Sequence, residues 1–319
     1  MINNSSIWIG CLPFGRELDE ASTVKLLQSL PSQHNYILDL SDIYANGNSL
    51  SIIINSFDSL PDNISLSLKL GLTSSCINSF FTVEPRSWKP QELYDSFLQF
   101  TNLVPIHRIH SFQLHALPYD LPSISNCIAC MNRISNDFSV EIGIANIETH
   151  QLLSLNNRLH HLDFIQLHAN IIEQKLIQDF TLLEKSSLPS YFIINRVFCR
   201  GLLNDFKNIF NNPSSRLNNS KRIKSSLTDE RLAILKEIHR LCQENSISVY
   251  ELSLAFCFVQ NISLIPILGG RTLDQFRHSI NILDNIDDTL LGLTSTICDT
   301  LISLYGESIF TSPPLAFER

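Results

Sequence analysis

The chain has 319 residues, of which 44% are hydrophobic and 17% charged, and this composition excludes wholesale disorder. A formal net charge of −8 argues against broad nucleic-acid binding, because phosphate backbones attract basic proteins. No apolar run reaches the roughly 20 residues that a membrane-spanning helix needs, and no basic segment leads into an apolar stretch at the N-terminus. We therefore expect a soluble, cytoplasmic protein that binds neither nucleic acid nor membrane, and the sequence leaves its oligomeric state open.

Short apolar runs rich in β-branched residues recur along the chain, separated mostly by amphipathic stretches. The predicted strands are Ile7–Ile9, Tyr36–Leu40, Ile64–Leu70, Ile109–His115, Val140–Ala145, Phe164–His168, Tyr191–Val197 and Leu264–Leu268. The predicted helices between them are Asp19–Leu30, Ser49–Phe57, Pro90–Thr101, Ser123–Ile134, Glu148–Leu155, Gln174–Glu184, Thr228–Cys242 and Val249–Phe258.

This alternation favours a parallel sheet whose strands are buried on both faces, and eight strand–helix repeats can close a barrel. We predict a single (β/α)8 TIM barrel over residues 1–319. The main alternative is an open doubly wound sheet, but the ten glycines form no GxGxxG or GxxxxGK loop of the kind that such sheets use for nucleotides. The glycines at 10, 71, 143 and 269 are expected at or just beyond the C-terminal ends of strands, where loops turn over a ligand.

Two segments interrupt the alternation, the additional helix Val249–Phe258 and the residues 200–227. Residues 200–227 form a long predicted loop after the seventh strand, and it carries four cations between positions 216 and 224. The loop is either a solvated surface segment or a flap over a phosphate-bearing ligand, since long loops in compact domains are often lids. Residues 284–319 are expected to form a terminal helix, Thr289–Ser303, and a tail that contains proline.

The eight cysteines are scattered through apolar stretches, which is typical of buried, reduced thiols. Cys127 and Cys130 form the one CxxC pair, and a zinc ribbon would need a second pair. His107 and His110 have a metal-like spacing, but no carboxylate or cysteine partner is evident. We expect no metal site.

Polar side chains stand at the ends of three consecutive predicted strands. Asp39 and Tyr44 follow the second strand, Lys69 ends the third in an apolar context, and His115 ends the fourth. Each of them alone has an ordinary structural explanation, such as a paired lysine or a hydrogen-bonded core histidine. In a barrel they would converge at the C-terminal mouth, where barrel enzymes hold their active sites.

Six segments in the same order resemble the aldo-keto reductase superfamily over nearly the whole chain. The stretch LDLSDIYANG is similar to the D-T-A-x-x-Y-G motif of the family, GIANIETHQL to its G-V-S-N-F segment, and FIQLHAN to its Q-x-x-x-N strand. The opening strand and loop (IGCLPFGRELDE), RVFCRGLL, and the closing segment VYELSLAFCFVQNISLIPILGGRTLDQFRHSINIL supply the other three likenesses.

The resemblance implies a role for each polar residue at the strand ends. Tyr44 would donate a proton to a substrate carbonyl, Lys69 would support it electrostatically, Asp39 would hold Lys69, and His115 would orient the carbonyl oxygen. These roles are chemically coherent, because a phenol with a pKa near ~10 transfers protons poorly at neutral pH without a neighbouring cation. A buried lysine in turn needs a carboxylate partner.

The resemblance also implies a nicotinamide cofactor, with NADPH preferred over NADH. Asn146 and Gln166 match the residues that hold the carboxamide, but Ala145 replaces a serine and Asn195 replaces the tyrosine that stacks on the ring. Arg196 also replaces a serine, and Ser279 stands where an asparagine contacts adenine.

The other cofactor residues implied are Arg200 at the pyrophosphate and Gly269, Arg271, Thr272 and Gln275 around the adenosine half, with Arg271 and Thr272 suited to a 2′-phosphate. Alternatively, Arg271 only caps the start of a helix.

Cys11, Leu12, Trp88 and His168 are the residues expected to line the substrate pocket. The function implied is NADPH-dependent reduction of an aldehyde or ketone, such as a sugar-like compound or a natural-product intermediate, by hydride transfer. The alternative is a regulatory or scaffold protein that binds a nicotinamide on the same barrel without catalysis, which the departures at positions 145 and 195 would suit. A third reading is an enzyme that uses the nicotinamide for other redox steps.

Overall fold

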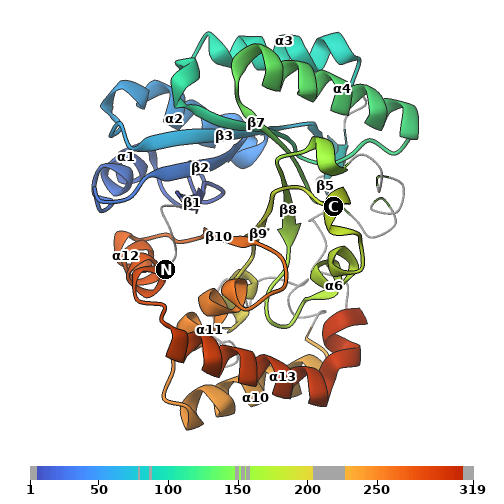
Figure 1. The fold of residues 1–319 in the computed structure, drawn as a ribbon. Helices are drawn as coiled ribbons and strands as arrows, with labels where there is room; N and C mark the ends of the chain where they lie inside the picture. Colours follow the sequence, from blue (N-terminus) through green and yellow to red (C-terminus); the bar gives the residue numbers. More distant parts are fainter. Residues whose placement is uncertain are drawn as a thin grey trace.

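Eight parallel strands close into a barrel at the centre of the molecule (Figure 1), in the order β1-β10-β9-β8-β7-β6-β3-β2. This computed structural model describes residues 6–77, 80–85, 88–147, 151, 155, 159–203 and 227–311. The strands are β1 (Ile7–Gly10), β2 (Tyr36–Ser41), β3 (Ile64–Leu70), β6 (Ile109–Leu114), β7 (Glu141–Ala145), β8 (Phe164–His168), β9 (Tyr191–Asn195) and β10 (Leu264–Leu268). The predicted (β/α)8 barrel is therefore confirmed.

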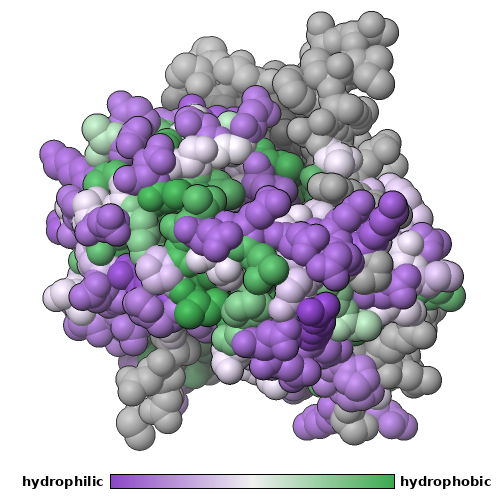
Figure 2. Space-filling model, turned by 90° about the horizontal axis from the view of Figure 1, so that it is seen from above, coloured by the Kyte–Doolittle hydropathy of each residue, from purple (hydrophilic) through white to green (hydrophobic). Residues whose placement is uncertain are grey.

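Helices surround the barrel, with α3 and α4 side by side over one flank and α10 and α13 over the opposite one (Figure 1). Their bounds are α1 (Glu20–Gln28), α2 (Asn48–Asn55), α3 (Pro90–Thr101), α4 (Leu121–Phe138), α6 (Lys175–Thr181), α10 (Asp229–Glu244), α11 (Val249–Ala255), α12 (Leu273–Asp284) and α13 (Asp288–Thr311). From the side of α3 and α4, hydrophilic side chains cover much of the surface and apolar ones lie between them (Figure 2). Within the described ranges, no helix combines the length and the hydropathy that crossing a bilayer requires.

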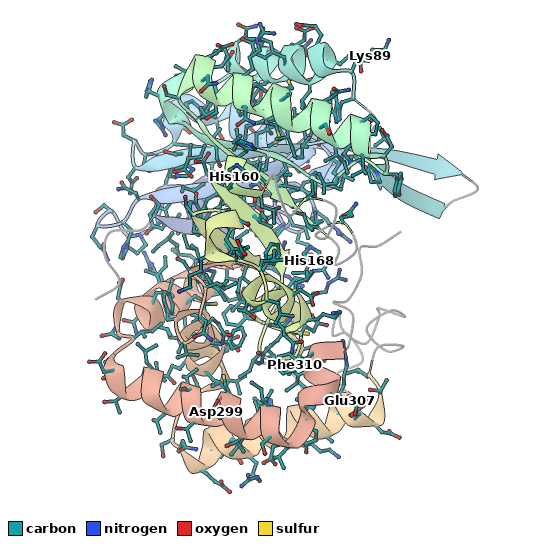
Figure 3. All side chains as sticks on the ribbon, turned by 45° about the vertical axis from the view of Figure 1, so that its right-hand side comes forward. Lys89, His160, His168, Asp299, Glu307 and Phe310 are labelled. Atoms are coloured by element: carbon teal, nitrogen blue, oxygen red, sulfur yellow. The ribbon has the colours of Figure 1, made fainter. Side chains whose placement is uncertain are left out.

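Three segments differ from the sequence-based expectation. The helix α12 was not among the predicted helices, although Thr272 caps it by accepting a hydrogen bond from the Gln275 amide. The terminal helix α13 extends to Thr311 rather than ending at Ser303, with a break in helical geometry at Tyr305. The strands β4 (Leu72–Ile77) and β5 (Phe80–Pro85) form an antiparallel hairpin that projects from the barrel (Figure 3), in a stretch for which no element was predicted.

Three predictions fall largely on residues outside the described part of the chain. The helix predicted over residues 148–155 includes six positions, 148–150 and 152–154, whose structure is not described. The same holds for residues 204–226 of the predicted loop and for residues 312–319 of the tail. The flap and the tail therefore stay predictions.

The apolar core has two parts. A small cluster fills the N-terminal end of the barrel interior, and a larger one lies between the strands and the helices. The inner cluster consists of Trp8, Ile37, Phe164, Ile193 and Ile267. The rings of Trp8 and Phe164 meet edge to face with centroids 5.7 Å apart. These side chains close the barrel below the polar residues that follow them along the same strands.

The cysteines agree with the prediction of buried thiols. Seven of them have described side chains, and all seven are free and buried. Cys127 and Cys130 lie on the buried face of α4. Burial raises the pKa of Cys127 to about 12 and that of Cys130 to about 11, so neither is a reactive thiolate at neutral pH.

Gly143 lies in the middle of β7 rather than at a strand end, which corrects the expectation from the sequence. A Cβ atom at this position would lie 2.3 Å from the ring of Phe164 on the neighbouring strand. The glycine is therefore required by the packing of the inner cluster, and not by a loop over a ligand.

Replacing Gly143 by alanine should overpack the barrel and destabilise the fold by about 1–3 kcal/mol. Shrinking the neighbouring ring in the double variant Gly143→Ala/Phe164→Leu should recover part of that loss. Gly292→Ala is a matched control, because nothing lies within 4 Å of the added Cβ and the position is helical, so alanine should be neutral or stabilising. Urea unfolding measures all three; an unchanged midpoint for Gly143→Ala would contradict the packing described.

Candidate active site

The register of three neighbouring strands brings Asp39, Lys69 and His115 to one end of the barrel. Lys69 on β3 stands opposite Ser41 on β2 and opposite Gln113 on β6. His115 follows directly after β6, and its amide donates a hydrogen bond to the carbonyl of Leu70. Parallel strands end on the same rim, so these side chains share the C-terminal mouth, as the sequence suggested.

Tyr44 reaches the same mouth from the turn that follows β2. Ala45, Asn46 and Gly47 have φ angles of 51°, 55° and 88°, which places three successive residues in the left-handed region. This conformation is strained for alanine, which carries a Cβ atom, and such strain is concentrated at functional sites. The turn bends the chain immediately after Tyr44 and holds its half-buried ring beside Lys69.

Lys69 is 1% exposed and forms an ion pair with Asp39, whose carboxylate is also buried. The other carboxylate oxygen of Asp39 accepts hydrogen bonds from the Gln113 amide at 3.2 Å and from the Gln166 amide at 3.0 Å. Burial disfavours the ammonium, but the charge and hydrogen bond of Asp39 outweigh it, so the pKa of Lys69 is raised. Lys69 is therefore a buried, permanently charged ammonium at neutral pH.

The Lys69 ammonium lies 5.1 Å from the centroid of the Tyr44 ring, so its positive charge is next to the phenol. Burial raises the pKa of Tyr44, and the charge of Lys69 opposes this shift without reversing it. Tyr44 is therefore protonated at neutral pH and has a cation ready to stabilise the phenolate that would form on proton loss.

His115 meets Tyr44 edge to face, with centroids 5.7 Å apart. Its Nδ1 atom lies 2.8 Å from the hydroxyl of Ser41, which in turn contacts a carboxylate oxygen of Asp42 at 3.1 Å. Burial, followed by the charge of Lys69, lowers the pKa of His115 well below its ordinary value. The imidazole is thus neutral at pH 7, and Ser41, which the sequence analysis did not single out, fixes its orientation.

A layer of small polar side chains lies below these four residues. The Ser111 hydroxyl donates to the Ser67 hydroxyl at 2.7 Å, and the Gln113 amide donates to the same oxygen at 2.8 Å. All three side chains are buried. The sequence analysis missed them, although polar residues at alternate positions of Ile64–Leu70 and Ile109–His115 mark the inward faces of these strands.

Three amide side chains at the mouth present acceptor atoms without hydrogen-bond partners among the described residues. They are Oδ1 of Asn146, Oε1 of Gln166 and Oδ1 of Asn195, and all three atoms are buried. The donor groups of Asn146 and Gln166 are already engaged, with the His115 carbonyl at 2.6 Å and with Asp39. Buried acceptors of this kind normally have partners, so the cluster fits a ligand that offers N–H groups, such as a carboxamide.

The residues assigned to the adenosine half lie in the loop after β10 and the first turns of α12. Thr272 caps this helix, and the Gln275 side chain accepts from the Arg271 amide at 2.7 Å. The guanidinium of Arg271 forms an ion pair with Glu17 in the loop after β1. Ser279 is buried within α12, whereas Gly269 is exposed.

Cationic groups line the side of the mouth formed by the loop after β9. Arg196 and Arg200 have φ angles of 64° and 59°, so both adopt the left-handed region that disfavours arginine. Burial lowers the pKa of His168 well below its ordinary value, and the charges of the two arginines add to the effect. His168 ends β8 opposite Asn195 and lies near the middle of the molecule (Figure 3).

The remaining predicted pocket residues differ in how far they reach the surface. Leu12 is 44% exposed, whereas Trp88 is buried against Gly71, the residue that connects β3 to β4. Cys11 has no exposed surface, and its thiol contacts the carbonyl of Ile9. Leu12 is thus available to a ligand, and Cys11 lies below the surface that a ligand would touch.

The Asp39–Lys69 pair should show strong coupling in a double-mutant cycle. Asp39→Asn leaves a buried ammonium without its counter-charge and should cost about 3–5 kcal/mol of stability. Asp39→Asn/Lys69→Met removes both charges and should cost less than the single variant. Urea unfolding at pH 7 of these two variants and of Lys69→Met completes the cycle; additive losses would show that the ammonium does not depend on the carboxylate.

The chain resembles known proteins both in sequence and in fold. A sequence model described as the Aldo/keto reductase family matches residues 6–289. Similar solved structures include the glycerol dehydrogenase AKR11B4 from Gluconobacter oxydans, with a TM-score of 0.71 and 17% identity over 93% of this chain and 91% of that one. The holo form of the aldo-keto reductase AKR11C1 from Bacillus halodurans has a TM-score of 0.66 and 17% identity over 92% of each chain. No curated protein sequence gives a match. The family match over most of the chain, on a closed barrel with these residues at its mouth, shows that the protein belongs to the aldo/keto reductase family.

Proposed function

We propose that this protein reduces an aldehyde or ketone with NADPH, and that Tyr44 donates the proton to the carbonyl oxygen. The observation that carries the proposal is the chain of contacts from Asp39 through Lys69 to Tyr44, with His115 against the Tyr44 ring. Catalysis needs an acid that is protonated before the reaction and whose conjugate base is stabilised as it forms. A half-buried phenol beside a buried ammonium meets both conditions.

The orienting role falls to His115 in its neutral state. If the Ser41 hydroxyl donates to Nδ1, the proton of the imidazole is on Nε2, and that N–H can donate to a carbonyl oxygen. The carboxylate of Asp42 is a second acceptor for the single hydroxyl proton of Ser41, and it competes with Nδ1 of His115. The tautomer of His115, and hence its ability to hold the substrate, depends on which acceptor Ser41 serves.

The cofactor proposal rests on the unsatisfied acceptors at the mouth. Asn146 Oδ1 and Gln166 Oε1 would accept the two N–H groups of a nicotinamide carboxamide. Ala145 offers no hydroxyl to the carboxamide oxygen, a loss of about 0.5–1.5 kcal/mol relative to a serine. When bound, the nicotinamide would supply the hydride, and the residues described here would position it and exclude water. Arg200, Gly269, Arg271, Thr272, Gln275 and Ser279 remain the proposed contacts of the rest of the dinucleotide, with Asn195 and Arg196 beside the nicotinamide.

The two features of the mouth that a substrate would meet are the arginine-lined side next to His168 and the exposed Leu12. Neither feature selects one compound, so the proposed substrate is a small carbonyl compound. The departures at Ala145 and Asn195 favour one alternative, a protein that binds the dinucleotide without turnover. The two functions predict different effects of the same substitution.

Tyr44→Phe should lower kcat for aldehyde reduction by about 10²- to 10⁴-fold, because it removes the proton donor and little else. The affinity for NADPH should change by less than about 2-fold, since the phenol contributes no proposed cofactor contact. Tyr305→Phe on α13 is the matched control and should keep full activity. Consumption of NADPH with a panel of aldehydes, together with calorimetric NADPH binding, makes both measurements. NADPH binding with no turnover in either the parent or the variant would favour the non-catalytic alternative.

The pH dependence of reduction follows from the two shifted pKa values. His115 titrates well below 6.5 and Tyr44 above 10, so neither group changes charge across the neutral range. We expect kcat/KM to stay level from about pH 6.5 to about pH 9 and to decrease only above pH 10 as Tyr44 loses its proton. An inflection between pH 6 and 7 that Ser41→Ala displaces would instead show that His115 titrates in the neutral range.

A further inference from the structure

Arg271, the residue proposed to receive the 2′-phosphate of NADPH, already has an acidic partner. Its Nε atom donates to a carboxylate oxygen of Glu17, which lies in the loop between β1 and α1. The backbone around Glu17 is fixed by a tight turn, in which the amides of Arg16, Glu17 and Leu18 all donate to the Pro13 carbonyl. The fold of this loop therefore fixes the backbone of Glu17 within reach of Arg271, just before α12 begins.

The ion pair is exchangeable rather than locked. The side chain of Arg271 is 47% exposed and that of Glu17 is 22% exposed, so water reaches both. Partly exposed pairs contribute little to stability and are exchanged readily for a stronger ligand. Glu17 also lines a hollow of about 420 Å³ together with Arg16 and Asn48, which gives its side chain room to turn away from Arg271.

We propose that Glu17 sets the dinucleotide preference of this protein by competing with the 2′-phosphate for Arg271. The inference rests on the proposed function, in which Arg271 faces that phosphate. NADP⁺ must displace the carboxylate and then bind next to it, whereas NAD⁺ has no group that needs Arg271. Glu17 thus lowers the affinity for NADP⁺ but not the affinity for NAD⁺, so that NAD⁺ can compete with NADP⁺ for the site.

Charge determines the size of the effect. A 2′-phosphate carries between one and two negative charges at neutral pH, and a carboxylate within a few ångströms repels it. Glu17→Gln keeps the size and the hydrogen-bonding capacity of the side chain but removes its charge. The substitution should therefore free the guanidinium without altering the loop.

The experiment is calorimetric titration of the full chain with NADP⁺ and separately with NAD⁺. Glu17→Gln should tighten NADP⁺ by about 3- to 10-fold and change NAD⁺ by less than about 2-fold. Glu20→Gln, which removes another exposed carboxylate nearby on α1, is the matched control and should leave both affinities unchanged within about 2-fold. In the Arg271→Ala background, Glu17→Gln should tighten NADP⁺ less than it does in the parent, because the group for which Glu17 competes is gone and only the direct repulsion of the phosphate is relieved.

The outcomes separate this inference from the proposed function. A selective loss of NADP⁺ affinity in Arg271→Ala, with no gain in Glu17→Gln, would support the cofactor site and overturn the role of Glu17. Equal tightening of NADP⁺ and NAD⁺ would also overturn it, since the carboxylate would then act on a part shared by the two dinucleotides. Failure of every variant to bind either dinucleotide would contradict both the proposed function and the inference. Thermal unfolding of each variant shows whether the fold is retained.

Discussion

The structure depends on one costly group, the buried ammonium of Lys69. Removing such a charge from water costs several kcal/mol, and the cost is offset only by close, well-oriented partners. Asp39 supplies the counter-charge, and the amides of Gln113 and Gln166 hold its second oxygen. Lys69 and these partners come from four different strands, so the charge is satisfied only when the barrel closes in this register. The polar layer of Ser67, Ser111 and Gln113 continues this network into the barrel, above the apolar inner cluster.

The same charge organises the groups around it. It opposes the rise in the pKa of Tyr44, and it helps to keep His115 neutral, so that an acid and a neutral hydrogen-bonding group face one mouth. Arg271 is also paired with a carboxylate, that of Glu17, but in an exposed setting. In the proposal above, a ligand phosphate would displace this carboxylate. The buried pair must be permanent because nothing else can solvate it, whereas the exposed pair can exchange. The difference in burial therefore separates the proposed catalytic role of Lys69 from the proposed selective role of Arg271.

Much of this arrangement could be predicted from the sequence, because burial on both faces leaves continuous apolar strands and makes isolated polar residues conspicuous. Lys69 and His115 stood out for this reason, and the spacing of Tyr44 from Asp39 placed the tyrosine in the next turn. Other features depend on how neighbouring strands are staggered, which no single segment encodes. The requirement for Gly143 arises from the ring of Phe164, and the partner of Arg271 lies near the other end of the chain. Ser41 and Gln113 become meaningful only once β2, β3 and β6 are aligned. The helix α12 was not predicted, because the residues around its start were interpreted through their resemblance to a cofactor-binding segment. In the structure, Thr272 and Gln275 of this segment make the hydrogen bonds at the start of the helix.

The charge state of Lys69 tests the account most directly. Titration of its side chain by carbon-13 NMR, assigned with Lys69→Met, measures the pKa in the folded protein. We expect Lys69 to keep its proton to pH 10.5 and above, since the attraction of Asp39 outweighs burial. Loss of the proton at or below neutral pH would show that burial prevails, that the ion pair is not formed, and that Tyr44 has no cation to support it.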